Sequence, residues 1–369
     1  MKYASSLLVL AATAAVPAFA QEGETNGAVV EGGLVATFQH AADDRVSDEA
    51  TASVDLAILL PASPGALNVH VEGSSSVGGD VVSALIPDAN ADVGTALDRD
   101  GDGRFQVSEL YYGIELGGTT VYAGLLDATG FLDGSDIAND EAAQFINATL
   151  VNNPTIEFPD YSIGLALQTA PQDGLPGLTL LAAGSHGLGD NPNRSYRQLL
   201  DMDADGKGVF VAAEVFWELG DITPRFGLWT QTADHDRFDG ASATADNRGA
   251  YGVIDGAAGS LRWNLRAGVA DERVSAAAWF AGAALERPVG PAVLGLGVTH
   301  TGVSGDAQDA APDALDDTTQ VELHARFDLG AQLQITPSIQ YVRNPGFDST
   351  GDAVDEETWV TGVRVTAAF

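Results

Sequence analysis

Short segments in which apolar and polar residues alternate dominate the chain from residue 27 to residue 369. The clearest is 320–329, where one phase is wholly apolar and the other wholly polar, and 260–269 and 333–341 repeat the pattern. A period of two residues is typical of a β-strand whose two faces meet different surroundings. The pattern therefore predicts an all-β fold.

The same pattern predicts how many strands there are and how they are connected. Sixteen segments can be counted: 27–39, 50–60, 65–74, 107–116, 119–127, 160–169, 176–184, 208–219, 222–232, 248–256, 259–270, 274–286, 290–301, 319–329, 332–343 and 358–369. Their connections alternate between short turns, such as 61–64, 117–118 and 330–331, and long excursions: 75–106, 128–159, 185–207, 233–247, 302–318 and 344–357. One short connection, 271–273, falls where a long one is expected, so a hairpin could be misplaced there.

The sorting of connections separates a membrane barrel from a soluble β-sandwich, which has no reason to place short turns at one end and long loops at the other. In a bilayer every backbone N–H and C=O must be paired within the protein, and a closed sheet achieves this. We therefore predict a transmembrane antiparallel β-barrel of about 16 strands, with short periplasmic turns and long extracellular loops. The apolar phase would face lipid and the polar phase would line a water-filled lumen.

The two ends of the sequence fit export to the outer membrane of a Gram-negative bacterium. Lys2, an apolar run over 4–16 and small residues over 17–20 have the order of a cleavable signal peptide. We expect a signal peptide over 1–20 and a single barrel domain over 21–369. The last strand places Phe369 on its apolar phase, as outer-membrane barrels commonly do.

Composition narrows the class further. No later stretch approaches the ~20 apolar residues of a spanning helix, although hydrophobic residues make up 45% of the chain. With 17 Lys and Arg against 52 Asp and Glu, the net charge of −35 argues against nucleic acid as a partner. This acidity also fits solubility in a salty habitat, and the absence of cysteine means that no disulfide supports the fold.

Two groups of short motifs resemble the carbohydrate-selective porin (OprB-like) family. The central group comprises 126–133, 138–141, 144–147, 150–154 and 158–161, and the second comprises 335–341 with 344–346. The resemblance implies a sixteen-stranded barrel that passes sugars passively. The acidic loops and the calcium-type loop described below depart from the family pattern and leave the solute open.

Counted on the long-loop side from the connection 40–49 between the first two strands, the loop at 128–159 is the third, which in many porins folds inward and narrows the channel. We expect its carboxylates to face arginines on the lumen phase of later strands and to set a transverse field. Tyr111 and Trp229 could then stack on sugar rings. Alternatively, the arginines only balance lumen carboxylates such as Glu322 and Asp328. The predicted pore-lining set is Asp133, Asp136, Asp140, Glu141, Arg225, Arg262, Arg266, Arg326 and Arg364.

A calcium-type loop precedes the fourth strand. Residues 98–109 fit the pattern D-x-D-x-D-G-x₅-E without a gap, and hard Ca²⁺ prefers six to eight oxygen ligands. The predicted ligands are the carboxylates of Asp98, Asp100, Asp102 and Glu109 and the carbonyl of Arg104. If the loop binds Ca²⁺, the ion would have a structural role. Alternatively, the match to the pattern is an acidic turn without a metal. Residues 201–206 open similarly but have Ala212 where the closing Glu belongs.

Enzymatic activity is not expected, because the six histidines, at 40, 70, 186, 235, 300 and 324, lack a nucleophile motif beside them. The predicted function is a passive channel for small polar solutes, most of all sugars, embedded in outer-membrane lipid. A general porin and a structural or adhesive barrel with calcium-ordered loops remain alternatives. Association with further copies of the chain is left open.

Overall fold

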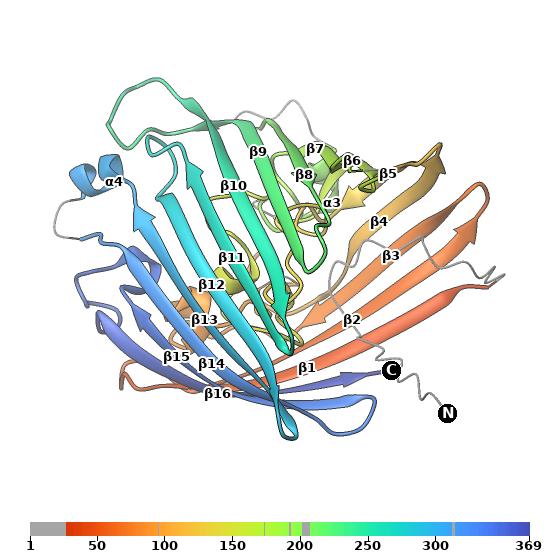
Figure 1. The fold of residues 1–369 in the computed structure, drawn as a ribbon. Helices are drawn as coiled ribbons and strands as arrows, with labels where there is room; N and C mark the ends of the chain where they lie inside the picture. Colours follow the sequence, from red (N-terminus) through yellow and green to blue (C-terminus); the bar gives the residue numbers. More distant parts are fainter. Residues whose placement is uncertain (1–26, 95, 173, 192, 201–206, 312–313) are drawn as a thin grey trace.

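Sixteen strands form one closed antiparallel barrel, in which consecutive strands are neighbours and β1 pairs with β16 (Figure 1). The computed structural model describes residues 27–94, 96–172, 174–191, 193–200, 207–311 and 314–369. The expected signal peptide, 1–20, lies outside this part of the chain. The strands are β1 Val29–Ala41, β2 Glu49–Ala62, β3 Gly65–Ser74, β4 Phe105–Leu116, β5 Thr119–Leu126, β6 Ser162–Thr169, β7 Gly177–Gly184, β8 Val209–Phe216, β9 Ile222–His235, β10 Ala245–Ala258, β11 Leu261–Ala270, β12 Ala277–Val289, β13 Ala292–Val303, β14 Thr318–Asp328, β15 Leu333–Arg343 and β16 Glu357–Ala368.

The predicted strand number and order are confirmed, and the differences are confined to strand ends. β9 and β10 extend their pairing beyond the predicted ends, through an irregularity in register between Ala245 and Asn247. The hairpin of β12 and β13 begins and ends two to three residues later than predicted. The short connection between β11 and β12 is real, because β11 ends at Ala270 and β12 begins at Ala277.

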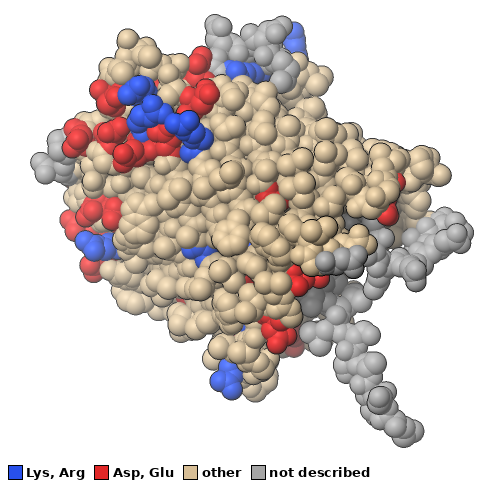
Figure 2. Space-filling model, turned by 45° about the horizontal axis from the view of Figure 1, so that its top comes forward, with Lys and Arg blue, Asp and Glu red and all other residues tan. Residues whose placement is uncertain are grey.

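The two phases of each strand meet different surroundings. Outward side chains such as Leu265, Leu296 and Leu323 are exposed, whereas their inward neighbours Asn264 and Glu322 are buried. On the face drawn in Figure 2, charged side chains gather mainly toward the edges and leave a broad wall of uncharged residues. This apolar outer wall with a polar inner face is the arrangement of a membrane barrel.

The helical segments are short and lie in the long connections. They are α1 Val82–Leu85, η1 Pro87–Ala89, α2 Ala148–Val151, α3 Tyr196–Leu199, α4 Gly305–Ala310 and η2 Pro345–Phe347. No helix in the described ranges is long and apolar enough to cross a membrane.

Two long connections, 75–104 and 127–161, fold into the barrel (Figure 1). They touch each other where the Ala91 N–H donates to the Ile146 carbonyl at 2.8 Å. Glycines on the wall let the second loop lie close: a Cβ added at Gly297 would stand 2.5 Å from Leu150. At Gly268 it would stand 2.1 Å from Thr155. The predicted inward fold of the third long loop is thus confirmed, and we call 127–161 the inner loop.

Candidate functional site

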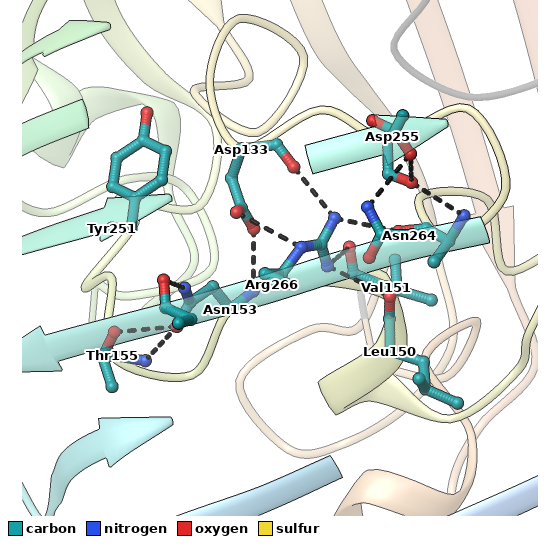
Figure 3. Close-up of polar contacts among 12 residues, drawn as sticks. Asp133, Leu150, Val151, Asn153, Thr155, Tyr251, Asp255, Asn264 and Arg266 are labelled. Atoms are coloured by element: carbon teal, nitrogen blue, oxygen red, sulfur yellow. Dashed lines mark hydrogen bonds and ion pairs between the residues drawn. The ribbon is translucent and has the colours of Figure 1, made fainter. Parts of the chain in front are cut away.

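Arg266 on β11 is the central anchor of the inner loop (Figure 3). Its guanidinium donates four hydrogen bonds of 2.9–3.1 Å to the carbonyls of Leu150, Val151, Asp133 and Ala138. Its Nε also lies 3.3 Å from Asp133 Oδ1, and both side chains are only 2% exposed. One planar cation therefore holds two separate stretches of the loop against the wall.

Three further arginines hold the loop in the same way. Arg326 donates to the Ala143 carbonyl at 2.6 Å. Arg364 donates to the carbonyls of Gln144, at 2.7 Å, and of Glu141. Arg262 donates to the Asp136 carbonyl, and it shares Glu286 with Arg326 at 3.1 Å. The arginines therefore bind mainly the backbone of the loop. Among the described residues, Arg266 makes a direct ion pair with the loop carboxylate Asp133, whereas Arg364 and Arg326 attract the loop carboxylate Asp140 from a longer distance.

Arg225, the fifth predicted arginine, contacts the wall and not the loop. Its Nη1 lies 3.7 Å from Glu214 Oε1, and its guanidinium lies over the Phe216 ring at 5.2 Å. Glu214 in turn accepts the Asp133 N–H at 2.9 Å and the Tyr251 hydroxyl at 2.8 Å. Arg225 thus supports the loop indirectly, through Glu214.

Wall carboxylates complete the attachment by accepting loop N–H groups. Glu322 accepts from Ile146 at 3.1 Å and from Asn147 at 2.8 Å. Asp255 accepts from the Asp136 N–H at 3.2 Å and from the Ser135 hydroxyl at 2.7 Å. Because unpaired buried backbone groups are costly, this two-sided pairing fixes an irregular segment inside the barrel.

The four predicted loop carboxylates have different surroundings. Asp133 is buried, and this burial raises its pKa to about 7 although Arg266 lowers it. Asp140 accepts the N–H groups of Ala142 and Ala143, and burial raises its pKa also. Asp136 is exposed. Glu141 lines the cavity described next, and its pKa is raised well above the usual range, first by burial and then by Asp140.

The predicted sugar-stacking role of Tyr111 and Trp229 is wrong, because the inner loop covers both rings. Tyr111 is 5% exposed and packs edge-on against Phe131 of the loop, with ring centroids 6.3 Å apart. Trp229 is 4% exposed and stacks on Phe210 at 6.1 Å. These rings form the apolar layer beneath the loop and leave no face open to a solute.

A cavity of about 270 Å³ remains between the inner loop and the inner faces of β2, β3 and β4. Its described lining contains no lysine or arginine, and we call it the acidic cavity. Burial raises the pKa of Asp92, which lies in the connection 75–104, to about 7, although a hydrogen bond from Ser53 lowers it. The acidic residues and the histidine among its lining are Asp55, His70, Glu72, Asp92, Glu109, Asp127, Glu141 and Asp160.

The calcium-type loop is only partly assembled. Asp98 Oδ1 accepts the N–H groups of Asp100 and Asp102 at 2.8 and 3.0 Å. Glu109 instead belongs to the acidic cavity, where it accepts the Asp127 N–H at 3.0 Å. The structure therefore does not bring Glu109 to the three aspartates, and calcium binding stays a prediction. The second candidate, 201–206, lies outside the described residues.

The acidic cavity was not predicted from the sequence. A signal for part of it was present, because His70 and Glu72 share the polar phase of the strand 65–74. Asp55 faces Glu72 directly across the β2–β3 pair. Asp92 and Asp160 lie in irregular connections, and no periodic pattern places such residues.

Comparison with known proteins agrees with this architecture. The profile of the "Carbohydrate-selective porin, OprB family" matches residues 49–369. An uncharacterised protein of Aquifex aeolicus is 48% identical over 65 residues, which is 18% of this chain and 21% of that protein, so the match spans about a fifth of that relative's length.

Among solved structures, the high-pH structure of Pseudomonas putida OprB superposes with a TM-score of 0.69 at 15% identity, covering 93% of this chain and 94% of the other. A mutant of Rh. blastica porin gives a TM-score of 0.54 at 13% identity, covering 93% and 100%. At these identities the likeness establishes the fold. With the family profile matching most of its length, the chain belongs to the carbohydrate-selective porin, OprB family.

Proposed function

We propose that the chain forms a passive, water-filled channel in the outer membrane for small polar solutes, above all carbohydrates. The observation that carries this proposal is a closed barrel whose inner face holds a pinned loop beside a polar cavity. A pinned loop narrows a wide barrel without filling it, which is how a porin sets its size limit. The family and fold indicate a channel rather than an enzyme.

The lining chemistry supports a hydroxyl-rich solute. Carboxylates accept hydrogen bonds from hydroxyl groups, and the acidic cavity offers them from both wall and loop. Among the lumen arginines with a described ion pair, Arg262 has the most exposed side chain, at 45%, against 21% for Arg225, 16% for Arg326 and 2% for Arg266. Arg262 is therefore the arginine placed to donate to a passing sugar.

The test is liposome swelling with the purified, refolded protein and a size series of sugars, amino acids and salts. Sugars should enter faster than other solutes of equal size, and Arg262→Ala should reduce this advantage because a water-exposed donor is lost. Arg343→Ala is the matched control. Arg343 is 51% exposed at the end of β15, 4.0 Å from Asp316, and its loss should leave the rates unchanged.

Each outcome separates the candidate functions. Entry that depends on size alone would replace the sugar channel by a general porin. No entry of any solute would overturn the channel and favour a structural or adhesive barrel. We also propose that the exposed apolar wall contacts outer-membrane lipid, and the number of chains in the assembly is to be measured by native mass spectrometry.

A further inference from the structure

The acidic cavity contains a cluster with the composition of a metal site. Ligating atoms of Asp55, His70 and Glu72 all lie within 4.8 Å of one another, and no other group of three His, Asp or Glu in the described ranges meets this limit. The three side chains come from the paired strands β2 and β3 and point into the lumen. Rigid neighbouring strands hold ligands more precisely than loops do.

We propose that Asp55, His70 and Glu72 bind one divalent transition-metal ion, of the class of Zn²⁺ or Mn²⁺, at the wall of the channel. An imidazole with two carboxylates suits such ions better than Ca²⁺ or Mg²⁺, which prefer oxygen alone. His70 Nε2 lies 3.2 Å from Asp55 Oδ1. Two ligand atoms on a tetrahedral zinc ion lie roughly 3.4 Å apart, given bonds of about 2.1 Å.

A second observation is that the sheet is irregular at this point. The register of β3 and β4 shifts between His70 and Val71, so that His70 pairs with Glu109 and Val71 with Val107. The extra residue, Ser108, is fully buried. The bulge turns both Ser108 and Glu109 toward the cluster, and bulges of this kind re-aim side chains at functional sites.

Both re-aimed residues contact the proposed ligands. His70 Nδ1 lies 3.8 Å from Glu109 Oε2, on the opposite side of the ring from Asp55. The Ser108 hydroxyl donates to Glu72 Oε2, and the Tyr161 hydroxyl donates to Glu72 Oε1 at 2.7 Å. Metal-bound histidines commonly donate their other N–H to a carboxylate, which fixes the ring. Glu109 is placed to be that carboxylate.

The charge of the surroundings also favours a cation. Carboxylates held in a confined site are stabilised by a counter-charge or a metal. The described lining of the cavity provides no arginine or lysine, because Arg266, Arg326 and Arg364 donate their hydrogen bonds to carbonyls of the inner loop. Of these, Arg364 on β16 attracts Asp92 and Glu141 of the lining. A bound divalent ion would add positive charge at the three proposed ligands.

The test is isothermal titration of the metal-free, refolded full chain with ZnCl₂ and MnCl₂. We expect one binding site per chain. His70→Asn should lower the metal affinity of this site at least about 100-fold, because it removes a ligand. Glu109→Gln should lower the affinity about tenfold, which is within the range for losing an outer-shell partner of a ligand. Two controls should bind as the wild type does. His300→Asn removes a histidine that lies 3.3 Å from Asp317, and Asp100→Asn changes the calcium-type loop.

A second measurement needs no variant. Zn²⁺ should protect His70 from diethylpyrocarbonate, read by peptide mass spectrometry, while His300 stays reactive because it lies outside the cavity. Absence of a stoichiometric site, equal binding by His70→Asn, or equal modification of His70 with and without metal would overturn the proposal. None of these results depends on sugar flux, so the channel proposal is tested separately.

Discussion

Arg266→Ala is expected to detach the inner loop from the wall and raise the single-channel conductance. The substitution removes hydrogen bonds to four loop carbonyls and leaves Asp133 buried without its cation. Removing one partner of a buried pair costs about 3–5 kcal/mol. Asp133 can avoid part of that cost by taking up a proton, but the four loop carbonyls lose their donor in either case. We therefore expect the loop to move toward water, which widens the channel and raises the size limit for sugars.

Two variants make the result specific. Arg266→Lys should resemble the alanine variant, because a lysine ammonium cannot replace the planar guanidinium group that donates hydrogen bonds to four carbonyls. Arg248→Ala removes an arginine that is 70% exposed and 3.7 Å from Asp271, and it should leave the conductance unchanged. Planar-bilayer recordings check all three. Wild-type conductance in both Arg266 variants would show that the loop does not depend on this anchor.

Raising the pH from 5 to 8 is expected to increase the preference of the channel for cations. Burial raises the pKa of Asp92 to about 7, and it also raises the pKa values of Glu141 and Asp160. An acid is neutral below its pKa and negative above it, so the cavity gains negative charge as the pH rises.

The expected size follows from Coulomb's law. One added carboxylate about 4 Å from a monovalent cation is worth about 1 kcal/mol in water, or roughly fivefold in population. Reversal potentials in a KCl gradient, with a chelator present, measure the preference at each pH. The double variant Asp92→Asn with Glu141→Gln should flatten the pH dependence of the cation preference. Asp136→Asn is the control and should leave that pH dependence unchanged, because Asp136 is exposed and lies outside the cavity lining. A pH-independent potential in the wild type would contradict the account.

The barrel was predictable because the alternation of apolar and polar residues that indicates it lies within each strand. An apolar outer surface and a polar lumen give a strand a period of two, and β14 shows this without exception over 320–328. Glycine pairs at tight turns, such as Gly117 and Gly118 with positive φ, mark the hairpins. Strand ends were less predictable, because pairing continues past the pattern where a neighbour supplies partners, as in β9 and β10.

The site was predictable in part. The sequence placed the arginines on the lumen phase, but it could not show that their partners are loop carbonyls, since every residue carries one. It also left Tyr111 and Trp229 open to solute, because burial under a loop depends on the path of that loop. Glu109 was assigned to calcium from spacing alone, whereas a bulge at Ser108 turns it toward His70.

Recordings of the purified wild-type protein in a planar bilayer show directly whether this chain is an open channel. We expect stepwise increases in conductance as single channels insert. Added sugar should reduce each step reversibly and saturably, because a bound sugar excludes ions from the narrowed lumen. A folded, heat-modifiable barrel that inserts without conductance steps would contradict the claim that this chain is an open channel.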